Sequence, residues 1–138
     1  VSLSKSYGCD CILIIIAALG QNQADEIYSE ALKQNLSVIV EVHDQKEAET
    51  ALKFDRALIG INNRNLKTLD VSLNNTISIF EVVKAHKGPL ISESGIKDEK
   101  DAQYIYEKTG IKNFLIGESL LKSDKPDALM KKLIQITQ

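Results

Sequence analysis

Five short runs of apolar, largely β-branched residues recur along the chain, separated by longer amphipathic segments. The runs cover residues 11–16, 37–42, 57–62, 89–93 and 113–117. Apolarity within each run is nearly continuous rather than alternating, which is typical of strands that are covered on both faces, as in parallel sheets. The pattern therefore predicts five buried parallel strands.

Between the runs, apolar residues recur at helical spacing. The predicted inward-facing residues are Ala24, Ile27, Ala31 and Leu32; Ala48, Ala51 and Leu52; Ile77, Phe80 and Val83; Ala102 and Ile105; and Leu129, Leu133 and Ile136. With a short leading helix over residues 3–7, these segments predict strands and helices in alternation.

Capping signals indicate where these helices begin and end. N-terminal signals are expected at Asn22, at the capping-box pair Asp44 and Glu47, and at Pro126, and C-terminal glycines at Gly88 and Gly110. The backbone N–H and C=O groups at a helix end have no partner within the helix. The capping side chains and glycines allow these groups to be hydrogen-bonded, and proline has no N–H to satisfy. The chain shows no linker, so we expect one domain over residues 1–138.

An alternating α/β chain has two common architectures, an open doubly wound sheet and a closed barrel. The length of 138 residues suits an open, flavodoxin-like sheet. A complete eight-unit barrel takes about 250 residues, so this chain would supply only part of one. Length favours the open sheet, whereas the chemistry at the strand ends favours a partial (β/α)8 barrel.

Polar residues gather where the predicted strands stop. They form the segments 41–43 (EVH), 62–65 (NNRN), 92–95 (SESG) and 117–119 (GES). In barrels, several strands contribute residues to one site at their carboxyl ends. An open sheet would concentrate function at one switch point, yet the loop that follows the first run (AALGQNQ) lacks a phosphate-binding glycine motif. We therefore predict a small-molecule site built from several strand ends.

Glu41 and His43 lie two residues apart and so face the same side of their strand. Burial at the strand end would raise the pKa of the Glu41 carboxyl toward a value useful for proton transfer. We expect Glu41 to be catalytic. The alternative is an ordinary helix start, capped by Asp44 with His43 as its neighbour.

Asn62 and Arg64 follow the third run. The Asn62 amide would orient a substrate hydroxyl or carboxylate, and the planar Arg64 guanidinium suits a carboxylate or phosphate. The alternative is an asparagine-rich turn, because asparagine tolerates left-handed backbone.

The last two runs end at Glu93-Ser94-Gly95 and at Gly117-Glu118-Ser119. Glycine lets the backbone approach a phosphate closely, and barrels often bind phosphate beside a short extra helix after the last strands. Residues 118–122 fit that helix. We expect only the backbone of Glu118 to serve, because its carboxylate would repel phosphate. The alternative is a pair of ordinary glycine turns.

Composition excludes several function classes. The 17 basic and 19 acidic residues leave a net charge of −2, so no nucleic-acid or membrane partner is expected. The longest apolar run, residues 11–19, is shorter than the about 20 residues of a membrane span, and Asp10 beside it argues against a signal peptide. Two cysteines fit a reducing compartment, which predicts a cytoplasmic protein.

Cys9 and Cys11 have the spacing of a C-x-C motif. The chain offers no second cysteine or histidine pair to complete a metal site, so we predict no metal. Buried packing is the expected role of both cysteines.

At these strand ends the sequence resembles indole-3-glycerol-phosphate synthase, a (β/α)8 barrel of tryptophan biosynthesis. The matching segments are residues 7–14, 41–44, 58–66, 92–96 and 114–120, and the most specific is GINNRNLK over residues 60–67. The resemblance is collinear over nearly the whole chain. It implies that the five runs are strands 4 to 8, the C-terminal part of the barrel.

The resemblance also implies an activity. The family converts 1-(o-carboxyphenylamino)-1-deoxyribulose 5-phosphate to indole-3-glycerol phosphate with loss of CO2 and water, and needs no cofactor or metal. By motif match, Glu41 and Asn62 resemble catalytic positions, and Arg64, Glu93 and Ser94 resemble substrate-contacting positions. The phosphate-cradling backbone is matched by Gly95, Gly117 and Glu118.

The chain departs from the family pattern in one large respect. The family's first-strand glutamate and lysine, and its third-strand lysine acid, have no counterpart here, and Lys5 lies in the leading helix. We therefore expect this chain alone to be inactive. Open strand edges predict self-association or pairing with a separate N-terminal half. The alternatives are a non-catalytic half-barrel assembly module and an isomerase of the related phosphate-binding barrels.

Overall fold

Each of the five apolar runs forms a strand in the computed structural model, which describes residues 1–136. The strands are β1 (Cys11–Ile15), β2 (Ser37–Val42), β3 (Leu58–Asn62), β4 (Leu90–Glu93) and β5 (Asn113–Leu115). All neighbours are parallel, and the sheet order follows the chain, β1-β2-β3-β4-β5. The α/β fold is consistent with a partial TIM barrel and confirms the predicted fold class.

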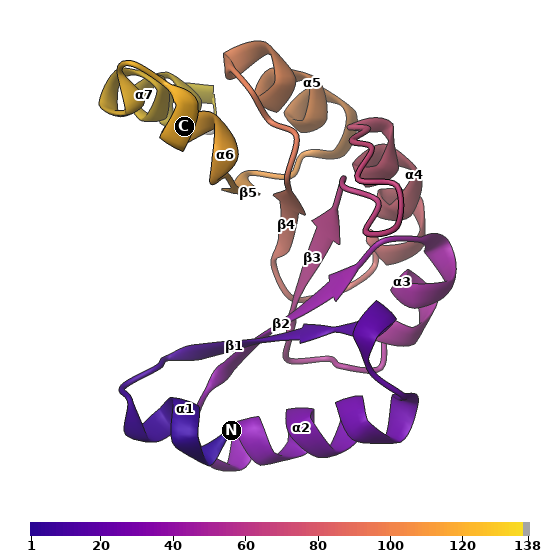
Figure 1. Ribbon diagram of the computed structural model, residues 1–138. Helices are drawn as coiled ribbons and strands as arrows, with labels where there is room; N and C mark the ends of the chain where they lie inside the picture. The colour runs from indigo at the N-terminus through magenta and orange to yellow at the C-terminus, as the bar shows by residue number, and fades with distance from the viewer. Residues whose placement is uncertain (137–138) are drawn as a thin grey trace.

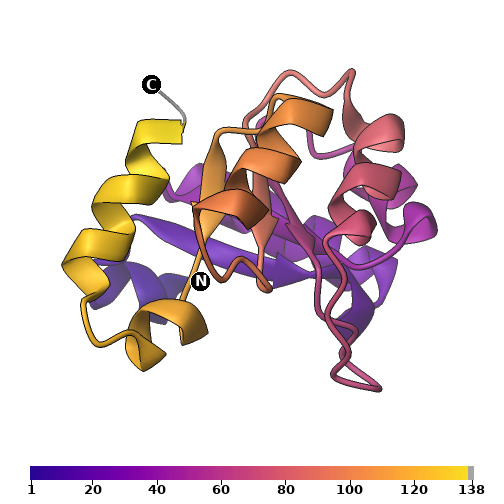
Figure 2. The same cartoon turned by 90° about the horizontal axis from the view of Figure 1, so that it is seen from above.

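The helices lie along the outer side of this curved sheet (Figure 1). They are α1 (Ser2–Ser6), the 3-10 turn η1 (Ile16–Ala18), α2 (Gln21–Lys33), α3 (Gln45–Ala51), α4 (Asn74–Val83), α5 (Glu99–Thr109), α6 (Glu118–Lys122) and α7 (Pro126–Ile136). Adjacent helices pack on one another, α3 on α4, α4 on α5 and α5 on α7, and Figure 2 shows α4, α5 and α7 in succession. The short helix α6 has the predicted bounds.

Two predicted caps are confirmed. The Asp44 carboxylate caps α3 by accepting a hydrogen bond from the Glu47 N–H at 2.8 Å. Gly110 ends α5 in the left-handed conformation, at φ +72°, where a side chain would be strained. The reciprocal half of the capping box is displaced by one residue, because the Glu47 carboxylate accepts from the N–H of His43.

Two other predicted caps are wrong. Gly20 is the N-cap of α2, and Asn22 lies inside that helix. The helix α4 ends at Val83, so Gly88 belongs to the loop that follows. Gly88 is required there by close approach, since a Cβ at this position would collide with the carbonyl oxygen of Ala57.

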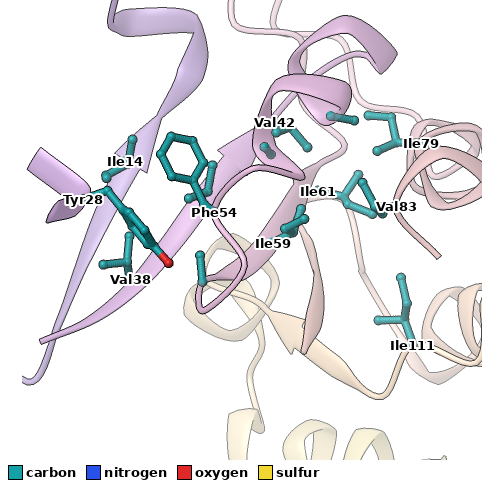
Figure 3. Close-up of a cluster of buried hydrophobic side chains, with 14 of the residues drawn as sticks. Ile14, Tyr28, Val38, Val42, Phe54, Ile59, Ile61, Ile79, Val83 and Ile111 are labelled. Carbon is teal, nitrogen blue, oxygen red and sulfur yellow. The ribbon is translucent and has the colours of Figure 1, made fainter. Parts of the chain in front are cut away.

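The hydrophobic core fills the space between the sheet and the helices (Figure 3). Alternate residues of β1, β2 and β3 point into it and are almost completely buried, namely Ile14, Val38, Val40, Val42, Ile59 and Ile61. From the helix side, Ile79 and Val83 of α4 meet them. The predicted inward face of α4 is partly wrong, because Thr76 and Ile79 are buried whereas Ile77 and Phe80 are only half-buried.

The other face of the sheet has no helix over it in residues 1–136. Its apolar residues remain accessible, and Leu13 on β1 and Leu115 on β5 are each 50% exposed. This face also explains a wrong prediction, because Cys9 and Cys11 are exposed rather than buried. Cys11 lies on the edge strand and points to the uncovered face, and Cys9 precedes the strand.

Neighbouring residues on β1 allow the two faces to be compared. Ile14→Ala leaves a cavity in the helix-covered core, so we expect it to lower the free energy of unfolding by about 2–5 kcal/mol. Leu13→Ala on the uncovered face is expected to cost less than about 1 kcal/mol. Urea denaturation of both variants measures the difference, and equal losses would contradict the assignment of the core to one face.

Candidate functional site

Three predicted site residues, Glu41, Asn62 and Glu93, lie side by side at the carboxyl ends of β2, β3 and β4. The strand register pairs Asn62 with Glu93 and Glu41 with Gly60, so all four residues belong to the uncovered face. Each of the three polar residues is nevertheless buried. Neighbouring strands therefore enclose two carboxyl groups and one amide in a small volume.

Glu41 is surrounded by potential hydrogen-bond donors. The Asn62 amide donates to Glu41 Oε1 at 3.1 Å, and His43 Nε2 lies 3.0 Å from the same oxygen. The other imidazole nitrogen of His43, Nδ1, lies 3.1 Å from Glu47 Oε2 on α3. Asn62 thus donates to the Glu41 carboxylate, whereas the buried His43 Nε2 makes no hydrogen bond within residues 1–136. The His43 imidazole lies between Glu41 and the start of α3.

Asn75 holds the ends of β2 and β3 together. Its side-chain amide donates to the carbonyl oxygens of His43 at 3.0 Å and Asn62 at 2.9 Å. The Asn62 carbonyl oxygen Oδ1 accepts from the backbone N–H of Arg64 at 2.9 Å. The Asn62 side chain is therefore oriented at both of its ends before any ligand binds.

A buried polar network on the helix side of the sheet supports the same strand ends. Asn63 donates to Ser92 Oγ at 3.0 Å and to the Ser94 carbonyl oxygen at 3.1 Å. It accepts from the N–H and the hydroxyl of Thr76 at 3.1 and 2.8 Å. Our sequence analysis missed this role. Strand alternation is the signal that separates Asn63, which faces the helices, from Asn62.

Glu93 carries the most perturbed carboxyl group. Burial, a hydrogen bond to Glu41 and the charge of Glu41, in decreasing order, together raise its pKa from 4.5 to about 8. A Cβ on Gly60 would collide with Glu93 Oε1 and lie 2.8 Å from the carboxyl carbon. The absence of a side chain at Gly60 therefore gives the Glu93 carboxyl its place.

The remaining predicted residues line a cavity of about 1120 Å³ beside the ends of β4 and β5. Its lining includes Arg64, Ser94, Gly95, Gly117, Glu118 and Lys122, but not Glu41, Asn62 or Glu93. Ser94 and Gly95 both adopt left-handed backbone, at φ +66° and +79°. The cavity lies next to the cluster of Glu41, Asn62 and Glu93, because its lining residue Ser94 directly follows Glu93 in the chain.

The Glu118 side chain takes part in the cavity wall. Its two carboxylate oxygens pair with Arg64 Nη2 at 2.7 Å and with Lys122 Nζ at 2.6 Å. Hydrogen bonds from Lys122 and Arg64 lower the pKa of Glu118. Three more cationic residues line the cavity, namely Lys97, Lys125 and Lys132. Cations therefore outnumber carboxylates there, which suits an anionic ligand.

Two features are absent from residues 1–136, a metal-binding cluster and a membrane-spanning helix. No cluster of three or more histidine, cysteine, aspartate or glutamate residues is placed to hold a metal ion. Nor does any of the helices combine the length and apolarity that crossing a membrane requires.

Sequence comparisons converge on one family. Residues 1–133 match the family model of indole-3-glycerol phosphate synthase. The chain is 44% identical over 125 residues to the indole-3-glycerol phosphate synthase of Acinetobacter baumannii, covering 90% of this chain and 46% of the relative. The synthase of Acinetobacter baylyi is 40% identical over 134 residues, with coverages of 96% and 49%. The chain thus spans about half the length of the curated relatives it matches.

Solved structures support the fold alone. A thiamine phosphate pyrophosphorylase from Pyrococcus furiosus superposes with a TM-score of 0.72 at 18% identity, covering 99% of this chain and 63% of that chain. A BexX/CysO complex from Amycolatopsis orientalis gives 0.69 at 12% identity, with coverages of 99% and 57%.

The raised pKa of Glu93 predicts a pH-dependent stability. Between pH 4.5 and about 8 the unfolded chain releases this proton while the folded chain keeps it. Glu93 therefore lowers the free energy of unfolding as pH rises, by up to about 1.4 kcal/mol per pH unit. Glu93→Gln should gain stability relative to wild type across this interval.

Urea denaturation at several pH values measures this gain. Glu49→Gln, at an exposed position of α3, is the matched control and should show no such trend. A pH-independent difference between Glu93→Gln and wild type would contradict the prediction.

Proposed function

The chain belongs to the indole-3-glycerol phosphate synthase family, and on that premise we propose that it carries the substrate-orienting, proton-transferring and phosphate-binding part of a synthase site. The observation that carries the proposal is the convergence of Glu41, Asn62 and Glu93 at adjacent strand ends, beside a cavity whose charged lining residues are mainly cations.

The proposed reaction of the complete site converts 1-(o-carboxyphenylamino)-1-deoxyribulose 5-phosphate to indole-3-glycerol phosphate, with loss of CO2 and water. Glu41 would act on protons, because its carboxyl group is buried at the strand end, where Asn62 orients it by a hydrogen bond. Asn62 would hold the substrate with an amide that is already oriented by its contacts with Glu41 and Arg64. No cofactor or metal is required in this proposal.

The substrate phosphate would bind in the cavity beside β4 and β5. The guanidinium of Arg64 offers paired donors, and the open space at Gly117 lets a ligand approach the backbone closely. Gly95 lines the same cavity. A phosphate would compete with the Glu118 carboxylate for Arg64 and Lys122. The backbone of Glu118 and the Ser94 hydroxyl complete the proposed contacts.

We expect the 138-residue chain alone to show no appreciable synthase activity. Ring closure in the family uses a lysine acid, and by resemblance no residue of this chain matches it, since Lys5 lies in α1. Formation of indole-3-glycerol phosphate by the purified chain is the measurement. Robust turnover would contradict the expectation.

Substrate binding tests the proposed site independently of turnover. Calorimetric titration with 1-(o-carboxyphenylamino)-1-deoxyribulose 5-phosphate should give saturable binding, which Arg64→Gln weakens about tenfold, or about 1.4 kcal/mol. Lys46→Gln, at an exposed position of α3 outside the cavity, is the charge-matched control. Absence of saturable binding would favour the second candidate, a non-catalytic half-barrel assembly module.

The uncovered sheet face supports the assembly module. It also supports a partner chain that would cover this face in the synthase. Leu13 and Leu115 are half-exposed on this face, and within residues 1–136 β1 and β5 each have one edge that pairs with no other strand. We propose self-association, or pairing with a separate N-terminal half, as the way this face is covered.

Light scattering of the chain should therefore give a mass above the 15.3 kDa of one copy. Leu13→Asp should shift the mass toward the monomer, whereas Leu121→Asp at the exposed surface of α6 should not. A monomeric mass at high concentration would argue against self-association and leave the separate half as the partner to be tested by mixing.

A further inference from the structure

We propose that Glu41 and Glu93 form a carboxyl–carboxylate pair that shares a single proton, with Glu93 as its acid member and Gly60 as the positioning residue that makes room for it. The use of the proton rests on the proposed function, but the pair itself does not.

The donors around the two carboxyl groups are unequal. Glu41 Oε1 receives the Asn62 amide and lies 3.0 Å from His43 Nε2. In contrast, Glu93 Oε1 is buried and receives no hydrogen bond from any donor group among residues 1–136. A buried carboxylate needs donors, whereas a protonated carboxyl can donate its own proton, here to the Glu41 carboxylate. The geometry therefore assigns the charge to Glu41 and the proton to Glu93.

Gly60 explains how two carboxyl groups fit on adjacent strands. It lies opposite Glu41 in the ladder and two residues before Asn62, on the same face as both. A Cβ there would overlap Glu93 Oε1 and would lie 3.2 Å from Ile39 Cγ2. Glycine also weakens a strand interior, so its presence at the centre of β3 calls for a compensating reason. Space for the Glu93 carboxyl supplies that reason.

The electrostatic surroundings agree with this assignment. Burial, the hydrogen bond to Glu41 and the Glu41 charge together raise the pKa of Glu93 to about 8. The titratable residues that β2 and its C-terminal end bring near Glu93 are Glu41 and His43, and His43 lies beside Glu41. The ladder partners of Glu93 are Asn62 on β3 and Leu115 on β5, neither of which titrates. One proton for two close carboxyl groups is the expected outcome, because both cannot ionise cheaply.

On the proposed function, the pair would serve the loss of water. Glu41 takes a proton from carbon, the electron pair of that C–H bond forms a C=C bond, and the C–O bond breaks. The departing hydroxyl takes the Glu93 proton and leaves as water. The proton on Glu41 then returns to Glu93 across their hydrogen bond, so the pair ends as it began. This makes Glu93 a proton donor as well as a substrate contact.

Carbon-13 NMR of the full chain labelled at its glutamate carboxyl carbons tests the pair without substrate. We expect one glutamate signal, absent in Glu93→Gln, to titrate with a midpoint of about 8. In Glu41→Gln the neighbouring charge is gone, so the midpoint should move toward the ordinary value of 4.5. A Glu93 signal that titrates in the ordinary acid range in the wild-type chain would overturn the proposal.

Gly60→Ala tests the positioning role, with Gly20→Ala as the matched control because a Cβ at Gly20 meets no atom within 4 Å. Gly60→Ala should displace the Glu93 carboxyl and abolish the high midpoint, and Gly20→Ala should leave it unchanged. An unchanged midpoint in Gly60→Ala would overturn the role of Gly60. If Gly60→Ala does not fold, the Glu41→Gln titration still decides whether the two carboxyl groups are coupled.

The two proposals can fail separately. A normal Glu93 titration with saturable binding of the phosphorylated substrate overturns the pair alone. A midpoint of about 8 without such binding supports the pair and overturns the proposed function.

Discussion

The register of the parallel ladder is the constraint on which the site depends. It sets Asn62 beside Glu93 and Gly60 beside Glu41, and a shift by one residue would turn each of these side chains to the opposite face. The apolar residues that alternate with them lock that register, because Val40, Val42 and Ile61 are buried under the helices. Packing on one face of the sheet thus fixes the chemistry on the other.

Hydrogen bonds between polar groups on the helix side of the sheet also fix the positions of the loops that follow the strands. Asn63 and Thr76 form a buried network with Ser92, and Asn63 reaches across to the Ser94 carbonyl oxygen. Asn75 joins the ends of β2 and β3. Such networks are costly when incomplete and rigid when complete. They connect the carboxyl cluster to the cation-lined cavity, so the two parts of the proposed site are held at fixed relative positions.

Much of the fold could be predicted from local pattern. The continuous apolar runs identified the five strands, and α6 and the caps at Asp44 and Gly110 were predicted correctly. Errors arose where tertiary packing overrides local preference. Thr76 is buried because Asn63 and Ser92 satisfy its hydroxyl, and Cys11 is exposed because its face of the edge strand is uncovered.

The sequence by itself determined which segments form strands and which polar residues follow them, because a short, nearly continuous apolar run is typical of a buried strand. It also contained the motifs by which the chain belongs to its family. Only the tertiary structure decided that Glu93 lies over Gly60, that Asn62 and Asn63 face opposite sides, and that Glu118 pairs with Arg64. These relations join residues on different strands and helices, and their geometry follows from ladder register and helix packing rather than from any local propensity.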